Sequence, residues 1–308
     1  MKTQIIRLLF LCIMLSICIQ TNAADLKRPK ILGISHLSVY AKDIENTKSL
    51  YTNFLGFDAP FAQQSSTFKI NDKQFVSVFQ EENAEADRFL NFGIETDDAE
   101  LMRKYIASKG YKVPDKVTLD KLGNQSFVVK DPVGNNCQII QYLPKSEVVK
   151  TKGKNLPTSR VSTSIKHVGM MVSNLNADLE FYRDVLGFQE IWRGSMDSVY
   201  VSWVHMKVPD GDQFIELSLY NLKLTKGAKG SMNHICLEVD SLPVAVNTLK
   251  NRILPSGCRL DKPRVGTNHK RQMNLFDADG TRIEIMEKNT FDGKKVASST
   301  LPPKKSME

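Results

Sequence analysis

The sequence lacks the cysteines that a disulfide-stapled fold would need. It has five cysteines in 308 residues, and Cys12 and Cys18 lie in an N-terminal leader that we expect to be removed. The other three, Cys137, Cys236 and Cys258, are an odd set scattered through apolar surroundings. We therefore expect at most one disulfide and one buried free thiol. The fold must come from a hydrophobic core rather than from cross-links.

The sequence also lacks a hydrophobic run that could cross a membrane as a mature helix. One apolar run, residues 8–19, follows two basic residues and ends before the small residue Ala23. A run of this length is shorter than a membrane span and is typical of a secretory signal peptide. We predict that residues 1–23 are a signal peptide and that the protein is secreted or periplasmic. We expect no membrane span in the rest of the chain.

No basic helix is present either, although the formal net charge is +8. The excess lysines gather in two polar segments, one near the middle of the chain and one at its C-terminal end. Such lysines are typical of solvated loops, so we expect no nucleic-acid partner. With 41% hydrophobic and 25% charged residues, the composition is that of an ordinary globular protein of about two domains. We expect a monomer or a homodimer.

The sequence does contain a long repeat. Residues 34–57 begin with Ile-Ser-His-Leu-Ser-Val and end with Leu-Gly-Phe, and residues 165–188 begin with Ile-Lys-His-Val-Gly-Met and end with Leu-Gly-Phe. The turns at residues 131–134 and 277–280 also correspond, and an apolar strand follows each turn. A repeat of this length indicates two domains of the same topology.

The domain boundaries follow from the repeat and from the composition between its copies. We predict domains at residues 30–145 and 165–288. Residues 146–164 are rich in Lys, Ser and Thr and lack apolar periodicity, which is typical of a linker. Residues 289–308 are similar in composition, and we predict that they form a flexible tail.

Each half contains a smaller repeat, which is clearest in the second half. There an alternating strand precedes a helix with apolar residues at helical spacing, and Gly187 is predicted to end that helix in a left-handed conformation. The same order then returns once. The predicted strands and helices lie near residues 167–172, 179–186, 199–208, 213–220, 234–239, 244–252, 272–276 and 281–286. This pattern predicts an α+β fold of two βαβββ units in each domain, with curved mixed sheets that enclose a cleft.

Four residues of the second half recur in register with this smaller repeat. His167 and Glu216 are separated by almost the same length of chain as His234 and Glu284. Each unit therefore has a histidine on its first strand and a glutamate on its last. If two such units pack about a pseudo-twofold axis, the four side chains converge in one cleft. Two nitrogen and two oxygen donors without a thiolate are typical of an open Zn, Ni, Co, Mn or Fe site.

These residues and their settings resemble the vicinal-oxygen-chelate superfamily, which includes glyoxalases, bleomycin resistance proteins and extradiol dioxygenases. The pattern of a His strand followed by a helix with Phe-Tyr-x-x-Val-Leu-Gly is present in residues 167–187 and is most similar to glyoxalase I. The resemblance covers both halves as a fold but only the second half as a site. It implies that His167, Glu216, His234 and Glu284 bind a divalent metal ion (Zn, Ni, Mn or Fe).

The resemblance also implies a reaction class. A small-molecule substrate would chelate the metal through two adjacent oxygens, and the enzyme would catalyse glyoxalase I-like isomerase or lyase chemistry. Glu216 or Glu284 would then loosen from the metal and move a proton between adjacent carbons. Met171 stands where glyoxalase I commonly has the arginine that holds the carboxylate of glutathione, so a glutathione adduct is not the expected substrate.

Two other functions stay open from the sequence. An extradiol-type ring-cleaving dioxygenase would need only His167, His234 and Glu284 as an iron triad, although Asn274 stands where those enzymes have a tyrosine. The second alternative is a non-catalytic small-molecule binding protein, like the metal-free members of the superfamily. Those members usually lack the four ligands.

The first half differs from the second at the same positions. It keeps His36 but has Ser77, Asn91 and Gln138 where the second half has its other three donors. We predict a degenerate domain that binds no metal tightly. Two further histidines of the second half, His205 and His269, are expected to be a partly buried structural residue and a surface-loop residue, respectively.

Overall fold

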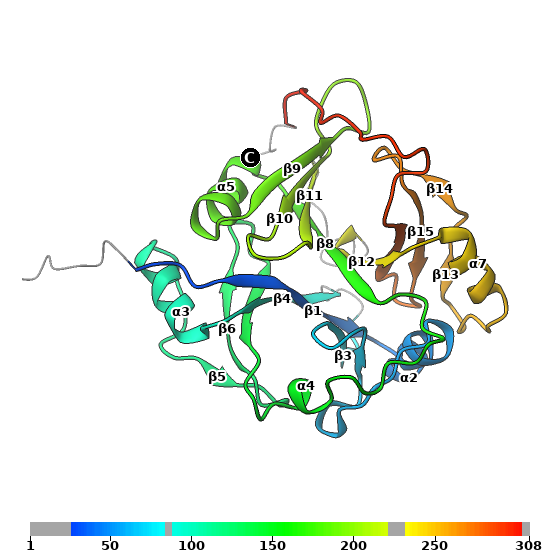
Figure 1. Ribbon diagram of the computed structural model, residues 1–308, viewed down its shortest axis with the longest axis horizontal. Coiled ribbons are helices and arrows are strands. Elements are labelled where there is room, and N and C mark those ends of the chain that lie inside the picture. The colour runs from blue at the N-terminus through cyan, green and yellow to red at the C-terminus, as the bar shows by residue number, and fades with distance from the viewer. Residues whose placement is uncertain (1–25, 84–87, 221–231, 304–308) are drawn as a thin grey trace, which may run out of the picture.

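The computed structural model describes residues 26–83, 88–220 and 232–303. It contains two curved β-sheets, one in each half of the chain, with the helices around their outer sides (Figure 1). The predicted α+β class is therefore confirmed. The predicted signal peptide, residues 1–23, lies outside the described residues.

The first half forms a seven-stranded sheet in the order β2-β3-β1-β4-β7-β6-β5. The first strands of its two units, β1 and β4, pair antiparallel in the middle, and β3 and β7 run parallel beside them. The strands are β1 (Ile31–Ala41), β2 (Thr67–Lys69), β3 (Phe75–Gln80), β4 (Phe89–Thr96), β5 (Thr118–Leu119), β6 (Gln125–Lys130) and β7 (Asn136–Gln141).

The second half repeats this plan in a nine-stranded sheet. Its order is β13-β15-β16-β12-β8-β11-β10-β9, and β14 also pairs with β15. Here β8 and β12 pair antiparallel in the middle, with β11 and β16 parallel beside them. The strands are β8 (Ser164–Val172), β9 (Gln189–Gly194), β10 (Trp203–Lys207), β11 (Phe214–Leu219), β12 (His234–Val239), β13 (Arg259–Leu260), β14 (Arg264–Val265), β15 (Arg271–Phe276) and β16 (Arg282–Glu287).

The predicted strands of the second half are confirmed, but β9 and the two-residue strands β13 and β14 were missed. The residues of β9, Gln-Glu-Ile-Trp-Arg-Gly, are mostly exposed or half-buried and show no apolar alternation. Among the described residues, the first half has only an isolated bridge between Asp58 and Lys69 at the corresponding place. The first unit of the chain therefore has one strand fewer than the predicted βαβββ order.

The helices begin where the sequence supplies side-chain caps. Asp43, Asp98 and Asn174 each accept a hydrogen bond from a backbone N–H of the first turn, which satisfies one free donor. Gly187 has φ of 77°, so the predicted left-handed end of the helix is confirmed. The helices are α2 (Ile44–Ser49) with its π-helical continuation η1 (Leu50–Phe54), η2 (Ala62–Gln64), α3 (Ala99–Ser108), α4 (Glu147–Lys150), α5 (Leu175–Leu179) with its π-helical continuation η3 (Glu180–Val185), and α7 (Leu242–Lys250).

The first helix of each half contacts the other half. The phenol of Tyr182 in η3 donates to the buried carboxylate of Asp131, and Tyr105 in α3 donates to the carbonyl of Val185. On the other side, Arg252 after α7 donates to the carbonyl of Phe54 in η1. Figure 1 shows the resulting pairs, α3 with α5 and α2 with α7, at opposite ends of the molecule. The two halves are therefore interlocked through their helices.

The two sheets also share one core. Buried apolar side chains from both halves form a single connected cluster, which includes Val39 and Ile94 from the first sheet and Val168 and Leu237 from the second. At its centre the amide of Gln74 donates to the carbonyls of Ile34 and Ile165 and accepts from the N–H of Ile165. This side chain thus satisfies backbone groups of β1 and β8 together.

The predicted linker and tail both have partners in the structure. The linker includes α4, and the buried ammonium of Lys69 donates to the carbonyls of Thr151 and Lys154. In the tail, the N–H of Ser299 donates to the backbone carbonyl of Arg193 in β9. Whether these segments are flexible stays a prediction.

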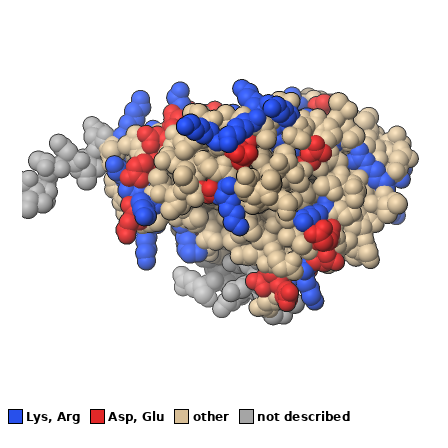
Figure 2. Space-filling model, turned by 90° about the horizontal axis from the view of Figure 1, so that it is seen from below, with Lys and Arg blue, Asp and Glu red and all other residues tan. Residues whose placement is uncertain are grey.

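The described residues include no helix that is both long and apolar enough to span a membrane. On the face shown in Figure 2, several lysine and arginine side chains lie side by side along the upper edge, and elsewhere basic and acidic side chains are mixed.

Candidate metal centre

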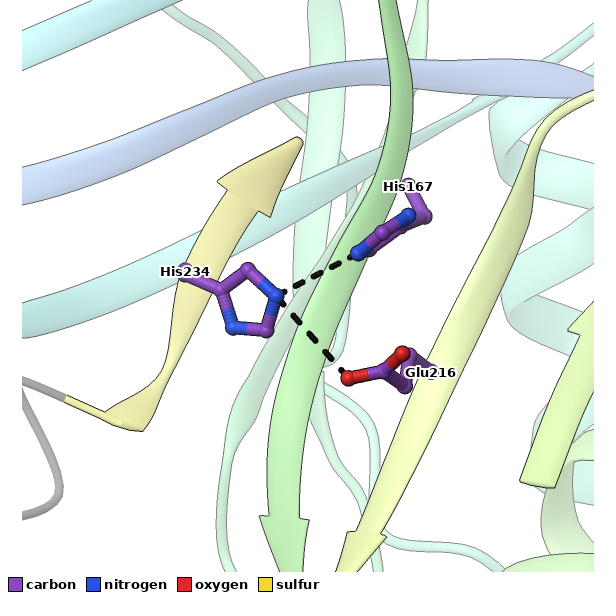
Figure 3. A group of neighbouring side chains, drawn as sticks. All are labelled: His167, Glu216 and His234. Carbon is purple, nitrogen blue, oxygen red and sulfur yellow. Dashed lines mark hydrogen bonds and ion pairs between the residues drawn. The ribbon is translucent and has the colours of Figure 1, made fainter. Parts of the chain in front are cut away.

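The four residues singled out in the second half converge on one point. They lie on the four adjacent central strands of the sheet: His167 on β8, Glu216 on β11, His234 on β12 and Glu284 on β16. The register places Glu216 and His234 on either side of Gly169, and places Glu284 beside Cys236. Strong curvature of the sheet turns these side chains toward a common cavity, and Figure 3 shows both imidazoles and the Glu216 carboxylate pointing at one another.

The distances between the donor atoms match a coordination shell. The Nε2 atoms of His167 and His234 are 3.2 Å apart, and His167 Nε2 is 3.2 Å from Oε2 of Glu284. His234 Nε2 lies 3.8 Å from Glu284 and 3.9 Å from Oε1 of Glu216. Ligand atoms bound to one ion at about 2.1 Å are about 3 to 3.5 Å from each other. The four donors therefore need only small movements to share a divalent ion.

The hydrogen bonding of the imidazoles also fits a metal. Nδ1 of His234 donates to the carbonyl of Met232 at 2.9 Å, so the lone pair of this ring is on Nε2, which faces the other donors and lies 3.1 Å from the guanidinium of Arg282. Nε2 of His167 faces the same point, while its buried Nδ1 has no partner among the described residues. Two imidazole nitrogens and two carboxylates facing each other repel unless protons or a cation lie between them. We conclude that the residues present fit a divalent metal ion.

The electrostatics keep the ligands in the forms that bind metal. Burial lowers the pKa of His234, and the nearby Arg282 cation lowers it further, so the imidazole is neutral. Burial alone would raise the pKa of Glu284, but its interactions with the adjacent His167 and His234 bring it well below its usual range. For Glu216, burial is likewise outweighed by a hydrogen bond from His205, and its pKa falls to about 2.

The two carboxylates are held differently. Oε2 of Glu284 lies within 3.8 Å of both imidazoles. Glu216 approaches only His234, at 3.9 Å, and its other oxygen accepts a hydrogen bond from Nε2 of His205 at 3.0 Å. Ser218 donates to Glu216 as well, at 3.3 Å. Glu284 is therefore the tightly enclosed ligand, and Glu216 has partners outside the metal shell that can keep it in place if it moves.

His205 was predicted to be a partly buried structural residue, and its structural position is more specific. It lies on β10 opposite Glu216, and burial lowers its pKa. Its ring lies between Trp192 and Phe214, with centroids 4.7 and 4.4 Å away. A neutral imidazole that donates from Nε2 orients the Glu216 carboxylate.

The cavity in front of the donors has a polar wall that the sequence did not reveal. It has a volume of about 60 Å³ and is lined by Glu216, His234, Glu284, Trp192, Trp203, Arg264, Gly266, Thr267, Asn268, Gln272 and Arg282. Arg282 is two residues before Glu284 on β16, so both side chains face the cavity. This alternation was the available signal for Arg282.

Other residues discussed from the sequence lie outside the donor set. His269 is exposed, has φ of 57° and pairs with Asp292 at 3.5 Å, although its neighbours in the loop line the cavity. Met171 is buried, and its N–H donates to the amide oxygen of Asn233. The buried thiol of Cys236 lies near His167 and Glu284, and burial raises its pKa well above the usual range. The three cysteines of the described chain are free thiols.

The first half has the same strand positions with different chemistry. Its register matches that of the second half at all four places, so the predicted equivalences are confirmed. The equivalent pairs are His36 and His167, Ser77 and Glu216, Asn91 and His234, and Gln138 and Glu284. In the first half these residues line a cavity of about 300 Å³.

Neutral hydrogen bonds saturate the first-half cluster. Nε2 of His36 lies 3.2 Å from the amide oxygens of Asn91 and Gln138, and Nδ1 lies 2.9 Å from the hydroxyl of Ser35. Burial lowers the pKa of His36 to about 4, so the ring is neutral and its single proton lies on Nε2, facing the two oxygens. The atom that would bind a metal is therefore protonated and already paired.

Comparison with known proteins agrees with this geometry. The model of the Glyoxalase/Bleomycin resistance protein/Dioxygenase superfamily matches residues 33–139 and 164–285. The mitochondrial methylmalonyl-CoA epimerase of Mus musculus is 32% identical over 133 residues, which cover 39% of this chain and 71% of the epimerase. The human mitochondrial methylmalonyl-CoA epimerase is 28% identical over 153 residues, which cover 44% and 84% of the two chains.

Solved structures share the fold over most of the chain. The Mn(II)-bound glyoxalase from Novosphingobium aromaticivorans has a TM-score of 0.65 at 16% identity and covers 90% of this chain and 88% of its own. The 2,3-dioxygenase LapB from Pseudomonas has a TM-score of 0.66 at 17% identity and covers 88% and 98%. At these identities the likeness concerns the fold alone.

Proposed function

The chain belongs to the Glyoxalase/Bleomycin resistance protein/Dioxygenase superfamily, and on that premise we propose that its second half is a metal-dependent enzyme that moves a proton at a carbon next to a carbonyl. His167, His234, Glu284 and Glu216 would hold the metal, and Glu216 would be the base. This is the isomerase or lyase chemistry of the glyoxalase and epimerase members, acting on a small substrate with two adjacent oxygens.

One observation carries the choice of base. Glu216 has partners outside the donor cluster, His205 and Ser218, whereas Glu284 is enclosed by the two imidazoles. A carboxylate that leaves the metal to take a proton needs other hydrogen bonds to keep its orientation. Glu216 meets this requirement and Glu284 does not. Glu216 lines the cavity, as Glu284 does, so it can reach a substrate bound there.

A bound divalent ion would act as a Lewis acid that stabilises negative charge developing on the substrate oxygens. The side chains of the protein supply the remaining functions. His167, His234 and Glu284 fix the position of the centre, and Glu216 receives the proton on Oε1, the oxygen that faces His234. Its Oε2 stays hydrogen-bonded to Nε2–H of His205, so the carboxyl group keeps its direction. Trp192 and Trp203 form an apolar wall that limits access of water.

A ring-cleaving dioxygenase is the second candidate, because His167, His234 and Glu284 also form a complete triad of the kind that binds iron. Glu216 is an argument against this candidate, because a dioxygenase triad has no role for a fourth ligand. Asn274, at the place of the expected tyrosine, lies 3.5 Å from Asp261 instead. We rank it below proton transfer for these reasons.

The reaction is tested by deuterium incorporation in D2O. The metal-loaded protein would be incubated with methylmalonyl-CoA, with the hemithioacetal of methylglyoxal and glutathione, and with catechol under air. We expect solvent deuterium to enter at the carbon next to the carbonyl of an acyl substrate. Glu216→Gln should bind metal more weakly and should lose exchange even when it is saturated with metal. Glu180→Gln, which changes an exposed glutamate, should leave exchange unchanged. Oxygen-dependent cleavage of catechol, or exchange that persists in Glu216→Gln, would contradict the proposal.

We also propose that the protein is exported, since residues 1–23 have the charge and hydropathy of a signal peptide. Mass spectrometry of protein from the producing cell should find an N-terminus near Ala24. An intact Met1 would contradict export and would restore glutathione adducts as plausible substrates.

A further inference from the structure

Two arginines in the cavity wall have no acidic partner among the residues that the structure describes. Arg264 in β14 and Arg282 in β16 line the cavity beside the carboxylates of Glu216 and Glu284. Arg282 donates to the carbonyl of Met232 at 3.2 Å and contacts His234, and no carboxylate of the described residues pairs with it. Its buried Nε also has no partner within the described chain. A half-buried guanidinium is usually paired with an acid, so this one is unusual.

Several other arginines of this protein are paired with an acid. Arg271, on the strand next to Arg282, lies 3.3 Å from Glu287, and Arg193 lies 2.6 Å from Glu190. Arg160 and Arg252 instead donate to backbone carbonyls, and neither lines the cavity. Arg282 differs from these two because it faces the metal centre.

The charges of the cavity are unbalanced once a metal is bound. The lining residues include two carboxylates and two guanidinium groups. If a divalent cation binds between Glu216 and Glu284, their two negative charges are matched. The charges of Arg264 and Arg282 then face the cavity without a counter-charge. An enclosed site of this kind binds anions in preference to neutral molecules.

The position of Arg282 restricts where the anionic group lies. Its guanidinium is 3.1 Å from Nε2 of His234, the atom that faces the metal. A group bound to Arg282 is therefore next to the metal and not at the far end of a long substrate. A guanidinium also matches a carboxylate well, since two parallel N–H groups can donate to its two oxygens.

We infer that the cavity takes an organic acid, with Arg282 binding a carboxylate that lies next to the chelating oxygens of the substrate. The cavity volume of about 60 Å³ admits only a small acid or the acidic end of a larger molecule. This inference rests on the proposed metal-dependent function and adds the substrate class to it. Arg264, at the exposed rim, supports the same charge preference.

The test measures binding of malonate and of malonamide, a neutral molecule with the same spacing of oxygens. The protein would be loaded with Mn(II), freed of excess metal, and titrated by calorimetry. Wild type should bind malonate about tenfold or more tightly than malonamide, as expected for a charged hydrogen-bonded pair. Arg282→Gln should lose most of this preference and Arg282→Lys should keep part of it. Arg259→Gln removes an arginine that pairs with Asp261 outside the cavity, and should behave as wild type.

Mn(II) content, measured by electron paramagnetic resonance, distinguishes a failure of the proposed metal-dependent function from a failure of the inferred substrate class. Wild-type protein that binds no Mn(II) would overturn the proposed function and this inference together. If Mn(II) binds but malonate is not preferred, or Arg282→Gln keeps the preference, only the substrate class is wrong. If Arg282→Gln loses Mn(II), Arg282 is a positioning residue for His234, and the inferred carboxylate-binding role of Arg282 is also wrong. Tighter, Arg282-dependent binding of inorganic phosphate than of malonate would replace the carboxylate with a phosphate.

Discussion

The two halves of the molecule present the same four strand positions to a cavity, with side chains of opposite character. In the second half, the Nε2 atoms of His167 and His234 face each other beside the carboxylates of Glu216 and Glu284. In the first half, the ring of His36 faces two amide oxygens with its proton. The strand register is the same, so the backbone is not what decides between them. Three side chains are enough to turn a set of metal ligands into a closed hydrogen-bonded cluster.

The comparison also shows how each cluster satisfies its buried polar atoms. The first-half cluster pairs within itself and holds no charge at neutral pH, because burial keeps His36 neutral. The second-half cluster places two carboxylates beside two imidazoles whose Nε2 atoms face each other, an arrangement that a bound cation would satisfy. A buried polar cluster is stable when it is satisfied internally or by a ligand, and the two halves are examples of each case.

The largest expected effect comes from removing one charged ligand. Glu284→Gln keeps the shape of the side chain but replaces an anionic donor with a neutral one, so metal affinity should fall by orders of magnitude while the fold persists. His36→Ala should leave metal content unchanged. Both variants would be titrated with the same metal in the same buffer, and stoichiometry recorded. If His36→Ala lost the metal and Glu284→Gln kept it, the site would have to lie elsewhere.

A smaller effect is expected from the glycine that faces His234. A Cβ atom on Gly169 would lie 1.9 Å from Cε1 of that ring, so Gly169→Ala must displace the imidazole. We expect metal affinity to fall by about tenfold to a hundredfold, as for changes that misorient a ligand. Calorimetric titration with Mn(II) or Zn(II) measures it.

The matching position in the first half provides the control. A Cβ atom on Gly93 would lie 2.1 Å from Nδ1 of His36. Gly93→Ala should therefore lower the melting temperature without changing metal affinity. Equal losses of metal affinity in both variants would mean that the first-half cluster affects the metal centre of the second half.

The smallest effect concerns Asp178, a buried carboxyl at the contact between the halves. Neither of its oxygens has a partner among the described residues, and burial, aided by Asp131, raises its pKa from 3.8 to about 8. The folded state keeps a proton that the unfolded chain releases, so the stability contributed at low pH is lost as pH rises from about 4 to about 8. Asp178→Asn should raise the melting temperature on the order of 5 °C at pH 9 and change it little at pH 4.

Thermal melts at pH 4, 7 and 9 check this prediction. Asp184→Asn, which changes an exposed carboxylate paired with Arg183, controls for the loss of one charge from the same helical region. An equal gain at every pH would show that Asp178 is not protonated in the folded protein.

Much of the fold could be predicted because it depends on local patterns. The strand that begins at His234 and the helix end at Gly187 appear where alternation and a left-handed glycine indicate them. The strand β9 was missed because its residues at the sheet edge are largely exposed and carry no apolar alternation. Edge strands are held by backbone hydrogen bonds, which a sequence does not display.

In the candidate site, only the residues that recur in the internal repeat could be predicted from the sequence. Its two copies in the second half identified His167 and Glu284 without knowledge of the sheet order, because each copy places its residues alike. His205 and Arg282 have no counterpart that marks them, and their roles depend on which strands lie side by side. The burial of Asp178 likewise depends on packing between halves that lie far apart in the sequence.

The packing of each half's helices against the other half has a consequence for which changes the chain can tolerate. The Phe-Tyr helix η3 packs against Asp131 and Tyr111 of the first half, so the domain with the intact donors cannot bury its own helix alone. Changes to the donor residues of the first half leave these helix contacts intact. Deletion of the whole first half would instead remove half of the scaffold around the second-half site. The first half therefore supports that site through its helices, whatever its own cluster binds.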